Sequence, residues 1–141
     1  MSNCISVQFI DDCEAVRQVV GQHFTSPFCP VTLTEKRSEL NLRHNVFVIN
    51  AQQPDTDLSL SETIKKICDQ HPNIPLSFQP IIIMTDGNSD PTLNVLREQK
   101  VTILEKPCDL GELFAEITSV MAEFSSFKNR LRSPEVELNY K

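Results

Sequence analysis

The chain has 141 residues and a mass of 16.0 kDa, which is the size of a single domain. Its composition, 40% hydrophobic and 23% charged, is ordinary for a soluble globular protein, and no apolar run approaches the roughly 20 residues that a membrane helix requires. The net charge of −6 provides no overall basic surface for a phosphate backbone, so we expect neither a membrane protein nor a nucleic-acid-binding protein.

Two further exclusions come from the amino terminus and the cysteines. Residues 1–4 lack the basic and long apolar segments of a secretory signal, so we expect a cytoplasmic protein. The five cysteines are odd in number and none forms a CxxC pair, which disfavours a disulfide framework and a structural zinc site. The chain also has no glycine-rich phosphate loop of the Walker or dinucleotide type.

The first third of the chain alternates between strand and helix patterns. Residues 5–10 form a β-branched apolar run typical of a buried strand, and apolar residues then recur at helical spacing over 13–24. A weak second strand is expected at 31–34, followed by a short charged segment, 35–42, that is only marginally helical. A third apolar run at 46–49 predicts another buried strand.

The middle of the chain continues the alternation. Residues 51–57 read as a loop, and Ser59 with Glu62 then forms a capping box, in which each side chain satisfies a backbone N–H of the first helical turn. The run 80–84 (PIIIM) is the strongest strand prediction in the chain. Asp90 followed by a proline is typical of a helix start.

The last strand is expected at 101–104, and a second capping box at Asp109 and Glu112 begins a long amphipathic helix. From Ser125 onward the chain is polar, so we expect it to be loosely ordered. The predicted organisation is therefore one domain at 1–124 and a polar tail at 125–141.

The order of these elements predicts the fold class. Five strands alternate with five helices, and strands that are apolar throughout belong to a parallel sheet covered on both faces. We therefore expect an α/β protein with a five-stranded parallel sheet, a doubly wound (βα)5 three-layer sandwich. In such folds the functional site lies at the carboxyl ends of the strands.

Polar residues follow four of the predicted strands. They are Asp11 and Asp12, Asn50, Thr85 and Lys106. Because the carboxyl ends of parallel strands share one edge, these side chains are expected to converge on a small polar basin. Hard oxygen ligands suit Mg²⁺, and a hydroxyl with an ammonium suits an oxyanion.

Four stretches of the chain, in this order and at this spacing, resemble the receiver domain of bacterial two-component response regulators. They are Phe9–Asp12, Val46–Asn50 followed by Gln53 and Pro54, Pro80–Thr85, and Leu104–Pro107 followed by Asp109 and Leu110. The resemblance covers roughly residues 6–124. It implies the flavodoxin-like receiver topology, an Mg²⁺-binding acidic pair, a phosphoacceptor, a switch hydroxyl, and a lysine before a cis-proline, Pro107.

The departures from the family pattern predict a degenerate member. The family has its phosphoacceptor aspartate four residues before the loop proline, and this sequence has Asn50 there. An amide is a far weaker nucleophile than a carboxylate, so no acyl phosphate is expected. The aromatic residue usual three places before the lysine is replaced by Ile103. With Asp11 and Asp12 facing Lys106, the local charge is about −1, so at most weak Mg²⁺ binding is expected and no other cofactor.

Alternatives stay open at this point. Asp11 and Asp12 also have a purely structural explanation, as helix-capping residues. A working phosphoreceiver would need a substitute acid, for which Asp55 and Asp57 are the candidates, although loop acids are ordinarily solvated. A flavodoxin-like cofactor binder would need a Gly/Ser/Thr-rich loop after the first strand, where this chain has Asp11, Asp12 and Cys13.

Without a phosphorylation switch, the expected function is non-enzymatic signal transduction through protein–protein interaction. The resemblance places the partner surface on the helix that begins after Asp90, the last strand and the last helix, and the residues selected there are Val95, Gln99, Ile103 and Glu116. The expected partner is a signalling protein, a histidine kinase or a second copy of the chain. A small basic patch at Lys128, Arg130 and Arg132 is the alternative docking surface.

Overall fold

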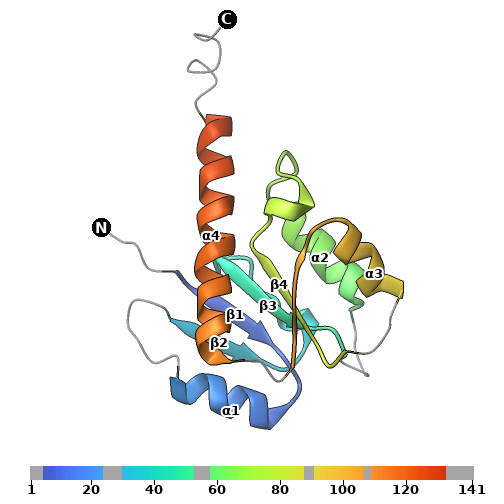
Figure 1. Cartoon of the computed structure of the whole chain (residues 1–141), viewed down its shortest axis with the longest axis vertical. Helices are drawn as coiled ribbons and strands as arrows, with labels where there is room; N and C mark the ends of the chain where they lie inside the picture. Colours follow the sequence, from blue (N-terminus) through green and yellow to red (C-terminus); the bar gives the residue numbers. More distant parts are fainter. Residues whose placement is uncertain (1–4, 24–29, 53–57, 88–90, 107–108, 133–141) are drawn as a thin grey trace, which may run out of the picture.

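The computed structural model describes residues 5–23, 30–52, 58–87, 91–106 and 109–132 (Figure 1). The loop acids Asp55 and Asp57, the helix start at Asp90, and Pro107 lie outside these ranges. None of the described helices is both long enough and apolar enough to cross a membrane.

The fold is an α/β sandwich built on a five-stranded parallel sheet in the order β2-β1-β3-β4-β5, which confirms the predicted class and topology. The strands are β1 (Val7–Ile10), β2 (Val31–Thr34), β3 (Val46–Asn50), β4 (Ile81–Thr85) and β5 (Thr102–Glu105). In the register, Ile10 lies opposite Ile49, Asn50 opposite Met84, and Thr85 opposite Glu105. The polar residues that end these strands therefore lie side by side at the carboxyl end of the sheet.

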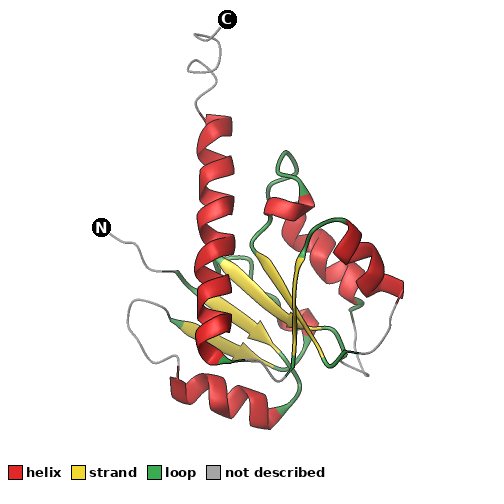
Figure 2. Cartoon of the chain, in the orientation of Figure 1, coloured by secondary structure: helices red, strands yellow, loops and turns green. Residues whose placement is uncertain are grey.

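In the described part of the chain, four α-helices cover the sheet, two on each face (Figures 1 and 2). They are α1 (Glu14–His23), α2 (Leu60–Cys68), α3 (Pro91–Glu98) and α4 (Leu110–Arg132). One core cluster joins Phe9 and Val48 to the apolar faces of α1 and α4, and the other joins Ile10 and Ile49 to α2 and α3. Neighbouring strand residues thus point to opposite faces, and both faces need apolar side chains.

The predicted capping box of α2 is confirmed. The Glu62 N–H donates to Ser59 Oγ at 3.0 Å, and the Ser59 N–H donates to Glu62 Oε1 at 3.1 Å. These bonds satisfy backbone donors that have no carbonyl partner in the first turn. The start of α2 is consequently determined by local sequence.

The expectation of five helices is wrong in one place. The segment predicted as marginally helical, 35–42, forms only a single 3-10 turn, η1 (Arg37–Glu39). The reason lies in Arg37, which is 3% exposed and points inward instead of extending a solvated helix face. A buried guanidinium needs acceptors, and both Nη atoms find them at the end of β3 and on the loop that follows it.

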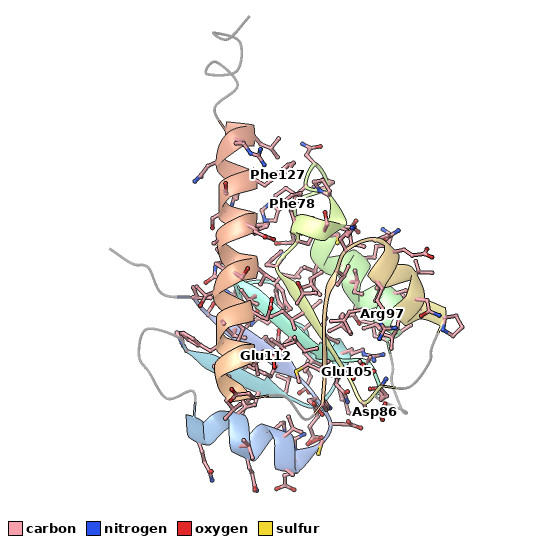
Figure 3. All side chains as sticks on the ribbon, viewed as in Figure 1. Phe78, Asp86, Arg97, Glu105, Glu112 and Phe127 are labelled. Carbon is pink, nitrogen blue, oxygen red and sulfur yellow. The ribbon has the colours of Figure 1, made fainter. Side chains whose placement is uncertain are left out.

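The expectation of a loosely ordered tail from Ser125 is also wrong for residues 125–132, because α4 continues to Arg132. Its last turns pack beside the sheet's amino end, where Phe127 contacts Phe78 with ring centroids 5.0 Å apart (Figure 3). Phe124 and His71 meet edge to face, also with ring centroids 5.0 Å apart. Packing of these rings stabilises the last turns of α4, a segment whose polar sequence predicted that the helix would already have ended.

Candidate functional site

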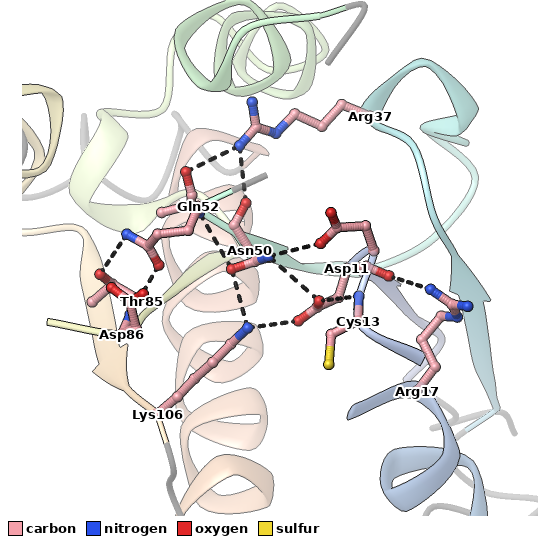
Figure 4. A network of polar contacts seen from close by, with 11 residues as sticks. Asp11, Cys13, Arg17, Arg37, Asn50, Gln52, Thr85, Asp86 and Lys106 are labelled. Carbon is pink, nitrogen blue, oxygen red and sulfur yellow. Dashed lines mark hydrogen bonds and ion pairs between the residues drawn. The ribbon is translucent and has the colours of Figure 1, made fainter. Parts of the chain in front are cut away.

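The carboxyl ends of β1, β3, β4 and β5 bring together every residue that the sequence selected for the polar basin (Figure 4). Hydrogen bonds or an ion pair join Asp11, Asp12, Asn50 and Lys106 directly. Thr85 joins them through Gln52, which the sequence interpretation missed. We call these six residues the strand-end site.

Asp11 is the buried anchor of the site, with 4% of its surface exposed. Its Oδ1 accepts from the Cys13 N–H at 2.9 Å, and its Oδ2 accepts from Lys106 Nζ at 2.9 Å. The first bond closes a turn just before α1, which begins at Glu14, so this carboxylate also has a structural contact in the loop. The second bond crosses from β1 to the end of β5 and is an ion pair with little access to solvent.

Asn50 sits between the charges as a neutral bridge. Its Oδ1 accepts from Lys106 Nζ at 3.1 Å, and its Nδ2 faces carboxylate oxygens of Asp11 and Asp12, each at 3.4 Å. This orientation is determined chemically, because an ammonium only donates and a carboxylate only accepts. Rotating the amide by half a turn would place donor against donor and acceptor against acceptor.

Gln52 bridges the loop after β3 to the end of β4. Its Nε2 donates to the Thr85 hydroxyl oxygen at 2.8 Å, and its Oε1 accepts from the Asp86 N–H at 2.9 Å. The Thr85 hydroxyl also accepts from the Gly87 N–H at 3.2 Å, in a turn where Gly87 has a φ of 94°. Thr85 is fully buried, and the Gln52 side-chain amide joins its hydroxyl to the N–H of the next residue, Asp86.

Two arginines support the loops around the site. Arg37 donates from Nη2 to the Asn50 and Ala51 carbonyls at 2.9 and 3.3 Å, and from Nη1 to the Leu58 carbonyl at 3.2 Å. Arg17 on α1 donates to the Asp11 carbonyl at 2.8 Å. Burial lowers the pKa of the Arg37 guanidinium, and the nearby Asp12 carboxylate opposes that shift.

Arg37 changes the charge balance that the sequence predicted. Asp11 and Asp12 against Lys106 leave a charge of about −1, and Arg37 close to Asp12 brings the local sum near zero. No local pattern marks Arg37 for burial, because it lies in a short charged segment that reads as solvated. Its role depends on where the loop after β3 lies in the fold.

The observed arrangement does not fit a bound Mg²⁺ ion as it stands. The place between the two carboxylates is taken by the N–H donors of Asn50, whereas Mg²⁺ requires oxygen ligands. Turning the amide oxygen toward Asp11 and Asp12 would break its bond to Lys106. Among the described residues, no group of three or more His, Cys, Asp or Glu side chains is placed to hold a metal ion.

The residues selected as a partner surface are unequal in exposure. Val95 is 51% exposed on α3, and Gln99 is exposed just beyond the end of that helix. Ile103 and Glu116 are half-buried, and Ile103 packs against the core cluster shared by α2 and α3. The strand that carries Ile103, β5, is an edge strand of the sheet.

No protein-family model and no curated protein sequence matches the chain. Solved structures do match over nearly the whole length. Adenylate cyclase from Rhodopirellula baltica superposes with a TM-score of 0.71 at 18% identity, covering 94% of this chain and 98% of that one.

Two receiver structures match in the same way. The signal receiver domain of an HD-domain-containing protein from Pseudomonas fluorescens Pf-5 has a TM-score of 0.69 at 18% identity, covering 88% of this chain and 99% of that one. A CheY-like response regulator receiver domain protein from Methanospirillum hungatei JF-1 has a TM-score of 0.71 at 15% identity, covering 88% and 98%. At these identities the likeness establishes the receiver fold, and function has to be argued from the site.

Proposed function

We propose that this chain is an atypical receiver domain that acts in signal transduction through protein–protein interaction, independently of aspartate phosphorylation. The role is non-catalytic, and its partner is a signalling protein such as a histidine kinase. The observation that carries the proposal is the Asn50 amide at the centre of the strand-end site, at the position where the receiver pattern has a nucleophilic carboxylate.

The chemistry of Asn50 opposes phosphoryl transfer. An acyl phosphate forms when a carboxylate oxygen attacks phosphorus and displaces the donor's leaving group. The Asn50 amide oxygen carries no full charge, and it accepts from Lys106 Nζ at 3.1 Å and from the Gln52 N–H at 3.3 Å. The lack of a negative charge and the two hydrogen bonds that it already accepts both make this oxygen a poor nucleophile.

The Gln52 bridge supports a domain held in one state. A phosphoryl group on residue 50 would need donors from the surrounding loops, and the Asp86 N–H already donates to Gln52 Oε1. The Thr85 hydroxyl oxygen accepts from the same side chain. We infer that an intramolecular amide occupies the positions that a phosphoryl oxygen would otherwise bind, so the partner surface is presented constitutively.

The test is exposure to a small phosphodonor. Wild-type protein incubated with acetyl phosphate and Mg²⁺ is expected to keep its intact mass, whereas Asn50→Asp restores a carboxylate and is expected to gain one phosphoryl group. A hydroxylamine-labile phosphoryl addition to the wild type would refute phosphorylation independence. If that addition disappears in Asp55→Asn or Asp57→Asn, the chain is a working phosphoreceiver with a substitute acid.

A further inference from the structure

A cavity of about 280 Å³ lies between α1, the first turns of α4 and the face of the sheet that these two helices cover (Figure 1). Its floor is formed by Phe9, Val48 and Met84, one residue each from β1, β3 and β4. Val16 on α1 and Leu113 on α4 are among the side chains that form its walls. We call it the α1–α4 cavity, and the proposed signalling role does not use it.

The cavity opens to solvent along α1. Ala15 and Val19 both line it, one helical turn apart, and both are exposed, Val19 by 45%. The floor residues Phe9 and Val48 are buried, with 3% and 2% of their surface exposed. A small molecule can therefore pass from solvent to the floor along α1 without any separation of the core.

The size and the walls of the cavity suit an apolar molecule. All but three of the described residues that line it are apolar. Protein interiors contain few voids larger than a water molecule, and 280 Å³ is the volume of about nine waters. Waters there would contact mainly hydrocarbon, so their replacement by apolar groups is favourable. A dry cavity of about 150 Å³ is enough for benzene, so this one accepts a ring with a short substituent.

The polar end of the cavity offers no unpaired charge. It is formed by Asp11, Asn50 and Lys106, next to the strand-end site. Asp11 and Lys106 are the ionised residues among the described lining, and they pair with each other at 2.9 Å. A charged ligand would lose its hydration in the cavity and find no free opposite charge there. The lining therefore favours an uncharged ligand.

We propose that the α1–α4 cavity binds a small uncharged molecule with one aromatic or branched aliphatic group and a single polar substituent. The apolar group covers Phe9, Val48 and Met84, and the substituent lies at the end formed by Asn50 and Lys106. The affinity depends on the absence of charge, because an anion or a cation of the same shape loses hydration without compensation.

Three probes of matched shape test this charge preference. At neutral pH acetophenone is uncharged, benzoate is an anion and benzamidine is a cation. Each is titrated into the full chain at fixed ionic strength, with methyl chemical shifts for the affinity and nuclear Overhauser effects from ligand to protein for the location. We expect saturable binding of acetophenone with contacts to the methyl groups of Val16, Val48 and Leu113. Both ions are expected to bind at least about tenfold more weakly.

A matched pair of variants fills or spares the cavity. Ala15→Leu places a larger side chain at the opening and is expected to weaken acetophenone binding by about tenfold or more. The larger side chain displaces no core contact, because Ala15 is exposed, and leucine is a good helix former. Ala122→Leu makes the same change at an exposed position of α4 that does not line the cavity, and it should leave the affinity unchanged.

Four results would overturn the proposal. The first is the absence of saturable acetophenone contacts at Val16, Val48 and Leu113, and the second is binding of benzoate or benzamidine as tight as that of acetophenone. The third is an equal loss of affinity in Ala15→Leu and Ala122→Leu. The fourth comes from sedimentation of the unliganded chain: a dimer that Ala15→Leu dissociates would assign the cavity to an interface between two copies instead of a small molecule.

Discussion

A single side-chain amide links the charged groups of the strand-end site. Asn50 contributes one acceptor toward Lys106 and donors toward Asp11 and Asp12. The result is a polar network that satisfies its own members and, with Arg37 close by, is nearly neutral. Such a network is rigid and has little need for a metal ion to relieve repulsion between carboxylates.

At the residue scale, the Asn50→Asp substitution is expected to strengthen Mg²⁺ binding, because it adds a charged oxygen ligand beside Asp11 and Asp12. We expect weak binding by the wild type and an increase on the order of tenfold in the variant, equivalent to about 1.4 kcal/mol. Isothermal titration of both forms at fixed ionic strength measures this. Equal affinities would show that the three carboxylates do not act on one ion.

The two half-buried imidazoles, His44 and His71, predict a pH dependence of stability. His44 and His71 both have pKa values lowered from the ordinary value of 6.5, chiefly by burial. The unfolded chain therefore takes up protons first as the pH falls through about 6.5, and the free energy of unfolding decreases until the folded state is protonated too. Stability is fully present above that pH, and the slope below it reaches at most about 1.4 kcal/mol per pH unit for each histidine.

Urea unfolding between pH 7.5 and 5.5 in a phosphate-free buffer checks this expectation. A double variant, His44→Asn with His71→Asn, should show a shallower dependence than the wild type. A wild-type stability that rises on acidification through this window would contradict the sign.

At the scale of elements, α4 is the clearest case of packing overriding sequence pattern. Its residues 125–132 follow the last predicted apolar position, yet they remain helical and cover the 3-10 turn η2 (Leu76–Phe78). The contact between Phe127 and Phe78 is reinforced by the Arg130 guanidinium, which lies 5.0 Å from the Phe127 ring centroid. A surface helix of this kind depends on its apolar contacts for stability.

Phe127→Ala is expected to lower the free energy of unfolding by about 2 kcal/mol, less than the loss for a fully buried phenylalanine because the ring is half-buried. Leu131→Ala is the matched control on the same helix, since Leu131 is 47% exposed, and it should change stability by no more than about 0.5 kcal/mol. Urea denaturation followed by far-UV circular dichroism reports both. Equal effects of the two variants would mean that the Phe78 contact contributes nothing.

At the scale of the whole molecule, the edge of the sheet at β5 is where a partner protein is expected. The strand is the last of the sheet, and it lies between α3 and α4 (Figure 1), so three elements meet at this edge. Exposed Val95 offers a small apolar centre, and Gln99 and Glu116 offer a polar rim, the usual anatomy of an interface. Ile103 is half-buried and packs against the core cluster shared by α2 and α3, so it belongs mainly to the core.

Val95→Ala and Ile103→Ala should therefore separate recognition from folding. We expect Val95→Ala to weaken self-association or partner binding while changing stability by less than about 0.5 kcal/mol. Ile103→Ala is expected to cost about 1–2 kcal/mol of stability, because it leaves a gap against the second core cluster. Analytical ultracentrifugation and pull-down measure association, and thermal unfolding measures stability. If association is unchanged in both variants, the partner surface lies on another face of the domain.

The sequence by itself determined the architecture and five of the six members of the strand-end site, all except Gln52. Local periodicity places each strand, the Ser59–Glu62 capping box begins α2, and a parallel sheet necessarily gathers Asp11, Asn50 and Lys106 at one edge. These features depend on residues close together in the chain, or on the order of elements alone. For that reason they are readable before any tertiary contact is known.

Only the tertiary structure decided how the site is completed. Arg37 is buried because the carbonyls of Asn50, Ala51 and Leu58 need donors, and Gln52 meets Thr85 across 33 positions of sequence. A charged or amide side chain is ordinarily solvated, and its burial becomes favourable only when the fold presents unpaired partners in the right geometry. No local pattern encodes that geometry, which arises when the loop after β3 is placed against η1 and β4.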